Sequence, residues 1–146
     1  MNGEGVVSSQ RSNLCFSRIG GGMGRRLTER PVVLIVEDEA VIRMNIVQVA
    51  EDAGYEALES ANADEAIDIL GCRDDICAVF TDVRMPGYMD GIRLAHVIRS
   101  RWRPIQLIIM SGSEVLDDFD FPWFIRKPYK NEQITAALRE VQSGQY

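Results

Sequence analysis

Chemically reactive side chains stand at the ends of several predicted strands in this chain of 146 residues. Short apolar runs, typical of strands buried in a parallel sheet, cover residues 32–36, 76–81, 105–110 and 123–126. The residues that follow these runs are Glu37, Asp38, Asp82, Ser111 and Lys127. Because ligands of such a sheet bind beyond the carboxyl ends of its strands, we expect these side chains to gather at one edge.

Three carboxylates brought together repel one another, so some must take up a proton unless a cation joins them. Mg²⁺ suits this group because it prefers hard oxygen ligands and keeps several waters. Asp38 and Asp82 are the expected direct ligands, with Glu37 holding a water of the ion. Phosphoryl transfer needs mainly positioning and neutralised oxygens, which Mg²⁺, the Lys127 ammonium and the Ser111 hydroxyl can supply. Asp82, between the cation and the lysine, is the expected nucleophile.

Helical patterns lie between the predicted strands and determine how these strands are connected. The first has an apolar stripe formed by Ile42, Ile46, Val49 and Ala53. The first helix is expected to end at Gly54, and the second to begin with a capping box at Asn62 to Glu65 and to end at Gly71. Asp90 is expected to cap the start of the third helix, and Asn131 to begin the last. Residues 55–60 form a poorer strand, expected at an edge. The alternation predicts an α/β domain with a parallel sheet and helices on both faces.

Four segments together resemble the receiver domain of response regulators in two-component signalling. They are Val-Leu-Ile-Val-Glu37-Asp38-Glu39, Phe-Thr-Asp82-Val-Arg-Met-Pro-Gly-Tyr-Met-Asp-Gly91, Ile-Met-Ser111-Gly and Ile-Arg-Lys127-Pro128-Tyr. The resemblance extends over residues 31–143, and the motifs are specific in combination. It implies a flavodoxin-like fold, a doubly wound five-stranded parallel sheet of order 2-1-3-4-5.

The resemblance also implies a role for each residue at the predicted edge. Asp82 would take a phosphoryl group from a sensor histidine kinase or a histidine phosphotransfer protein. The metal, Mg²⁺, would be held by Asp38, Asp82 and the backbone carbonyl of Arg84, with Glu37 acting through water. Phe124, three residues before Lys127, matches the switch aromatic of the family, and Pro128 matches its cis-proline turn.

Two departures from the family pattern stand out. The acidic pair is Glu37-Asp38 rather than the commoner Asp-Asp, a difference of one methylene that a water-bridged ligand should tolerate. Residues 112–122 are all that separate Ser111 from the predicted strand at 123–126. A mean helix needs about 11 residues before its loops are counted. We therefore expect the fourth helix of the family to be shortened or missing.

Composition and charge divide the chain at about residue 30. Residues 1–30 carry five Arg against Glu4 and Glu29, a charge of +3, whereas residues 31–146 carry 11 basic and 20 acidic residues, a charge of −9. The first segment is expected to be a disordered tail, or an artefact if translation begins at Met23, and residues 31–146 to be the receiver domain. An acidic domain repels the nucleic acid backbone. The three cysteines indicate neither a disulfide framework nor a zinc site.

These features predict a stand-alone receiver in the cytoplasm, without a DNA-binding domain. No apolar run approaches the about 20 residues that a membrane span requires. The output partner stays unknown, and a homodimer is an open option. We expect no enzyme beyond the receiver's own phosphorylation and dephosphorylation.

Two other functions compete with that of a phosphoacceptor. One is a Mg²⁺-dependent phosphatase with an aspartyl nucleophile, but the best-known enzymes of this kind place a second acid two residues after the nucleophile, where Arg84 stands here. The other is a binding module that needs no phosphorylation, which is disfavoured because every chemical residue is present. Dinucleotide binding is excluded because residues 36–39 stand where a glycine-rich turn is needed.

Overall fold

The structure, a computed structural model, describes residues 30–85, 87, 89–102, 104–112 and 123–143. These residues form a parallel sheet with the strand order β2-β1-β3-β4-β5. Its strands are β1 (Val32–Val36), β2 (Glu56–Ser60), β3 (Ile76–Asp82), β4 (Gln106–Ser111) and β5 (Trp123–Arg126). The predicted doubly wound sheet is confirmed, and the poorer second strand does lie at an edge.

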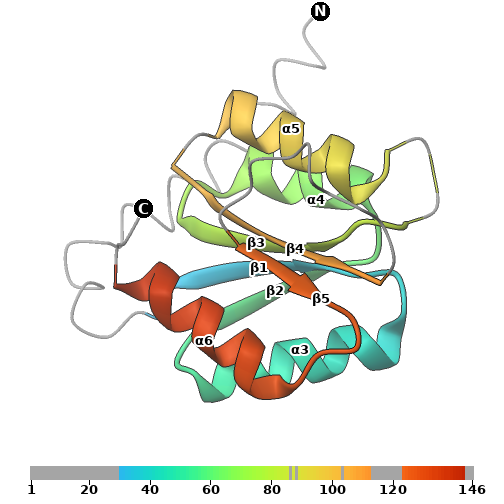
Figure 1. Ribbon diagram of the computed structural model, residues 1–146. Helices are drawn as coiled ribbons and strands as arrows, with labels where there is room; N and C mark the ends of the chain where they lie inside the picture. Colours follow the sequence, from blue (N-terminus) through green and yellow to red (C-terminus); the bar gives the residue numbers. More distant parts are fainter. Residues whose placement is uncertain (1–29, 86, 88, 103, 113–122, 144–146) are drawn as a thin grey trace, which may run out of the picture.

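Helices cover both faces of the sheet (Figure 1). They are α3 (Ala40–Asp52), α4 (Ala63–Cys72), α5 (Gly91–Arg101) and α6 (Asn131–Gln142). The first and last of these lie on one face, and α4 and α5 lie on the other. This arrangement leaves the ends of the strands, rather than the faces of the sheet, as the place where polar groups can meet.

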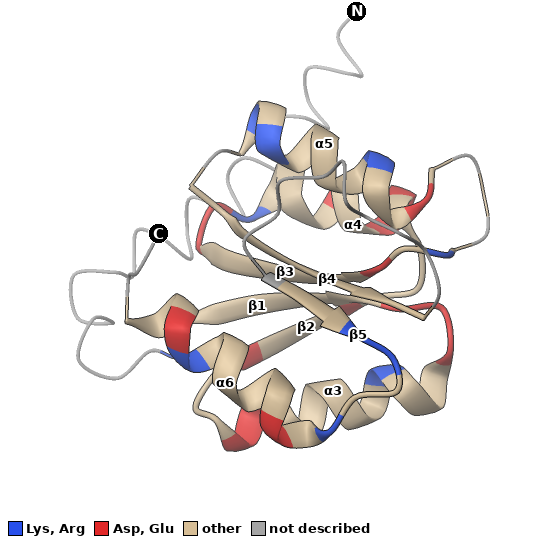
Figure 2. Ribbon diagram, viewed as in Figure 1, with Lys and Arg blue, Asp and Glu red and all other residues tan. Residues whose placement is uncertain are grey.

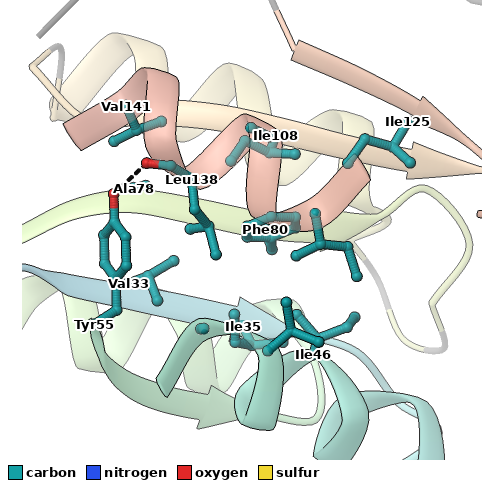
Figure 3. Packing of buried hydrophobic residues seen from close by; sticks show 14 of the residues in the cluster. Val33, Ile35, Ile46, Tyr55, Ala78, Phe80, Ile108, Ile125, Leu138 and Val141 are labelled. Carbon is teal, nitrogen blue, oxygen red and sulfur yellow. Dashed lines mark hydrogen bonds between the residues drawn. The ribbon is translucent and has the colours of Figure 1, made fainter. Parts of the chain in front are cut away.

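The central strand β1 shows why the sheet must be covered twice. All its residues are buried, and alternate side chains belong to different hydrophobic clusters. Val33 and Ile35 pack with residues of α3 and α6, including Ile46 and Leu138 (Figure 3). Val32, Leu34 and Val36 pack with residues of α4 and α5. A strand with no polar face can be stable only between two layers of helices.

Most of the predicted helix limits are confirmed by their caps. The Asn62 side chain accepts a hydrogen bond from the Glu65 N–H, and Asp90 accepts one from the Arg93 N–H. Gly54, just after α3, has a positive φ of 95° that favours glycine. The predicted end of the second helix at Gly71 was wrong, because α4 continues to Cys72 and Gly71 does not adopt a positive φ.

Two predictions fall outside the part of the chain that the structure describes. The shortened fourth helix was predicted for residues 112–122 and the disordered tail for residues 1–30, and of these only residues 112 and 30 are described. The described strand β5 begins at Trp123, which confirms the predicted strand at 123–126. Among the described residues, Cys72 and Cys77 take part in no disulfide bond. No described helix has the length and apolar character needed to cross a membrane.

Candidate functional site at the carboxyl end of the sheet

Acidic residues lie where β1 and β3 end (Figure 2), and the three predicted acids come together there. Val36 pairs with Thr81 across these neighbouring strands, so the next residues, Glu37 and Asp82, come side by side. Asp38 follows in the loop. One carboxylate oxygen from each of the three acids lies within 4.8 Å of the others. Glu37 and Asp82 are buried and Asp38 is exposed, so the cluster opens to solvent on the side of Asp38.

Lys127 reaches this cluster from β5, the edge strand opposite β2. Its Nζ donates a hydrogen bond of 2.8 Å to Asp82 Oδ2 and lies 3.9 Å from Glu37 Oε2. The lysine follows β5, and its backbone N–H donates to the Ser111 carbonyl at the end of β4. Burial by itself lowers the pKa of Lys127, but the hydrogen bond and charge of Asp82, together with the charge of Glu37, outweigh burial and raise it. The ammonium is therefore firmly charged in the presence of these acids.

Glu37 is the least satisfied member of the cluster. Its Oε1 accepts a hydrogen bond of 3.0 Å from the Glu39 N–H, whereas its buried Oε2 accepts none from any described residue. The pKa of Glu37 is raised to about 7, mainly by burial. The neighbouring Asp38 and Asp82 contribute to the rise, whereas the Glu39 N–H and Lys127 oppose it. A buried carboxylate oxygen without a donor, beside two further carboxylates, fits a hard divalent cation. The residues present could hold a metal ion.

The remaining predicted site residues lie around Asp82. The Arg84 N–H, in the loop after β3, donates a long hydrogen bond of 3.4 Å to Asp82 Oδ1. Ser111 is buried at the end of β4, one residue after Met110, which pairs with Asp82. The Lys127–Pro128 peptide bond is cis, as the family pattern implied.

Phe124 lies at some distance along β5 from these groups. It pairs with Ile109 of β4, two positions before the end of that strand, and its side chain is 38% exposed. The proposed switch role of Phe124 stays a prediction.

Two residues next to the site were not singled out from the sequence. Gly91 begins α5, and a Cβ there would overlap the backbone carbonyl oxygen of Asp82. Its signal was a glycine directly after the capping Asp90, where a stronger helix former would be expected. Arg43 donates to the carbonyl of Glu37, and this contact had no sequence signal because it depends on where α3 packs.

The fold and this edge define a class of protein, namely flavodoxin-like α/β domains with an acidic cluster and a lysine beyond the carboxyl ends of their parallel strands. Within that class, residues 33–139 match the family model of the response regulator receiver domain. The chain therefore belongs to this family, and it contains a receiver domain of two-component signalling.

Curated relatives agree with this assignment. A response regulator of Rickettsia bellii described as NtrX-like is 31% identical over 119 residues, or 75% of this chain and 24% of that protein. The sensor kinase CckA of Brucella abortus is 33% identical over 129 residues, or 82% of this chain and 13% of that protein. The chain thus spans a quarter or less of the length of these relatives.

Solved structures support the fold. The receiver domain of NtrX from Brucella abortus has a TM-score of 0.70 at 24% identity, covering 76% of this chain and 98% of that one. A response regulator receiver protein from Sinorhizobium medicae has a TM-score of 0.73 at 23% identity, covering 82% of this chain and 99% of that one.

Proposed function

We propose that this protein is a phosphoacceptor that receives a phosphoryl group on Asp82, with Mg²⁺, from a histidine kinase or a histidine phosphotransfer protein. The observation that carries the proposal is the meeting of Asp82 with two other acids and with Lys127 Nζ at 2.8 Å. A carboxylate held between a cation site and an ammonium is suited to attack a phosphoryl group. The phosphorylated domain would then signal through contacts with a downstream protein.

The metal would be held by the carboxylates of Asp38 and Asp82 and the backbone carbonyl of Arg84, with Glu37 acting through a water. The buried Glu37 Oε2, which accepts no hydrogen bond from any described residue, supports this division, because a water bound to a cation would donate the missing hydrogen bond. When bound, Mg²⁺ supplies positive charge to the oxygens of the transferred group.

The protein's own groups account for the remainder of the transfer. An Asp82 carboxylate oxygen forms the new O–P bond while the P–N bond of the donor phosphohistidine breaks. The donor ring, protonated on its other nitrogen, keeps the bonding electrons and leaves as neutral imidazole. Lys127 already pairs with Asp82 and would neutralise a phosphoryl oxygen as it arrives. The Ser111 hydroxyl, at the end of the neighbouring strand, would hydrogen-bond another oxygen.

The exposed face of α3 supports contact with a protein donor. Val41 is 80% exposed and Met44 is 65% exposed, and these residues lie three apart on one side of the helix that follows Asp38. Exposed apolar side chains beside a reactive group favour docking of a partner. The similarity of this chain to part of a sensor kinase is in keeping with a phosphorelay.

We further propose that the domain does not turn over a separate substrate. Arg84 stands two residues after Asp82, where aspartyl phosphatases carry a second acid. The site therefore lacks the second acid at that position that would protonate a leaving group.

Intact-mass analysis tests the central proposal. After incubation with acetyl phosphate and Mg²⁺, the full chain is expected to gain one phosphoryl group. Asp82→Asn should gain none, and chelation of Mg²⁺ should prevent the gain in the wild type. Full phosphorylation of Asp82→Asn would show that another residue is the acceptor.

A second measurement separates docking from chemistry. Val41→Ser with Met44→Ser should slow transfer from a phosphorylated histidine phosphotransfer protein about tenfold but leave the reaction with acetyl phosphate unchanged. Equal rates with the protein donor would place the docking surface elsewhere.

A further inference from the structure

Arg43 connects the acidic loop of the site to the neighbouring edge strand. Its Nη1 donates a hydrogen bond of 2.7 Å to the Glu37 carbonyl, and its Nε donates one of 3.1 Å to Glu59 Oε1 on β2. The Arg43 side chain is only 19% exposed although it carries a full charge. The guanidinium is planar and rigid, so two hydrogen bonds fix its position well.

The Glu37 carbonyl belongs to the peptide unit that joins the two acids of the site. Other hydrogen bonds hold the same turn: the Glu37 N–H donates to the Ser60 carbonyl at 3.0 Å, and the Glu39 N–H donates to Glu37 Oε1 at 3.0 Å. With Arg43, the N–H, the carbonyl and one side-chain oxygen of Glu37 are all engaged. Rotation of the Glu37–Asp38 peptide would break the contact with Arg43 and turn the Asp38 side chain away from Asp82.

We propose that Arg43 is a positioning residue for the cation. It holds the Glu37–Asp38 peptide in the orientation that directs both carboxylates to one ion, and Glu59 holds Arg43 in turn. This inference rests on the proposed function, because it requires that the acidic cluster binds Mg²⁺. Arg43 itself contacts neither the ion nor the phosphoryl group in this arrangement.

Charge and geometry predict opposite effects at this residue, which makes the inference testable. A positive charge close to the acidic cluster repels Mg²⁺, so its removal should tighten binding if charge alone mattered. If Arg43 acts by position, its removal should weaken binding, because groups that orient metal ligands contribute about 10- to 100-fold to affinity. Lysine keeps the charge but cannot donate to Glu37 and Glu59 in the same fixed geometry.

Isothermal titration of the full chain with Mg²⁺ distinguishes these effects. We expect Arg43→Gln and Arg43→Lys each to bind Mg²⁺ about tenfold more weakly than the wild type. Glu59→Gln should weaken binding only about twofold, since Glu59 is half-exposed, and should add nothing to Arg43→Gln. Phosphorylation by acetyl phosphate should return to the wild-type rate when Mg²⁺ saturates each variant.

Arg73, at the amino ends of the strands, provides a matched control. It is also an arginine that bridges two acids, Asp75 at 2.6 Å and Glu56 at 3.6 Å, and its side chain is 13% exposed. Arg73→Gln should lower the melting temperature and leave the Mg²⁺ affinity unchanged. A loss of affinity in this variant equal to that in Arg43→Gln would mean that the effect is one of general stability, and would overturn the inference.

Asp38→Ala separates the inference from the proposed function. One outcome refutes the inference alone: the wild type binds Mg²⁺, Asp38→Ala does not, and both Arg43 variants bind at least as tightly as the wild type. In that case Arg43 has no positioning role, and the proposed function stands. If the wild type itself binds no Mg²⁺, the proposed function fails and the inference fails with it.

Discussion

The charged groups at the amino ends of the strands are paired differently from those at the carboxyl ends. At the amino ends of the strands, Arg73 forms two hydrogen bonds to Asp75, at 2.8 and 2.6 Å, and an ion pair with Glu56. At the carboxyl ends, Glu37, Asp38 and Asp82 come together with Lys127 as the cation among them. At the amino ends both acids contact Arg73, and these three groups have a formal charge of −1. At the carboxyl ends three acids accompany one lysine, and these four groups have a formal charge of −2.

The difference shows where this fold carries electrostatic strain. At the carboxyl edge the Glu37 Oε2 atom is buried without a hydrogen bond from any described residue. A group of this kind destabilises the folded state unless a ligand completes it. The amino edge can therefore be understood as serving stability and the carboxyl edge as serving binding, and the following predictions test that distinction from the largest effect to the smallest.

Gly91→Ala should produce the largest loss of stability. The new Cβ would overlap the Asp82 carbonyl oxygen, which belongs to the backbone of a buried strand and has no room to move. We expect a loss of about 3 kcal/mol in the free energy of unfolding, measured with urea. Gly71→Ala is the control, since a Cβ there meets nothing within 4 Å, and it should stabilise α4 slightly. Similar values for the two variants would contradict the close approach at Asp82.

Asp38→Ala should weaken Mg²⁺ binding about a hundredfold, equivalent to about 2.7 kcal/mol. Glu37→Ala should weaken it only about tenfold, because a water-held acid can be partly replaced by solvent. Titration of each full-length variant with Mg²⁺ measures the ratio. Equal losses would count against the division of roles between the two acids.

Glu37→Gln should stabilise the metal-free protein at high pH. The pKa of Glu37 is raised from 4.5 to about 7, so the wild type loses stability as the pH rises from about 4.5 to about 7, because in this range the carboxyl ionises in the unfolded state but stays protonated in the folded state. With chelator present, the variant should exceed the wild type by about 2 kcal/mol at pH 8, and the two should converge at pH 4.5. Saturating Mg²⁺ should remove the advantage at pH 8. A difference independent of pH would show that Glu37 is not strained by its charge.

Tyr55→Phe should have the smallest effect and should leave the site untouched. The buried Tyr55 hydroxyl donates a hydrogen bond of 2.6 Å to the Leu138 carbonyl and so ties the start of β2 to α6 (Figure 3). Its loss should lower the free energy of unfolding by about 1 kcal/mol. The affinity for Mg²⁺ is expected to stay the same, and a clear change would mean that the two edges are coupled through the core.

Much of the site could be predicted from the sequence because parallel strands deliver their carboxyl ends to one edge. Five residues placed only by strand position, Glu37, Asp38, Asp82, Ser111 and Lys127, all lie there in the structure. The two-sided burial of β1 followed from its unbroken apolar sequence, which can be stable only between helical layers. Capping residues such as Asn62 and Asp90 act within one turn, so the sequence determined them as well.

Tertiary structure decided the features that depend on how distant elements pack. Whether Glu37 or Asp38 faces solvent depends on how the loop after β1 lies against β3, and only the structure shows Glu37 buried and Asp38 exposed. The contact of Arg43 with Glu37 and Glu59 joins residues on three different elements, and the space left by Gly91 is filled by the backbone of Asp82. Local patterns could not predict these contacts, because each is set by distances between segments that the chain brings together only when the core is packed.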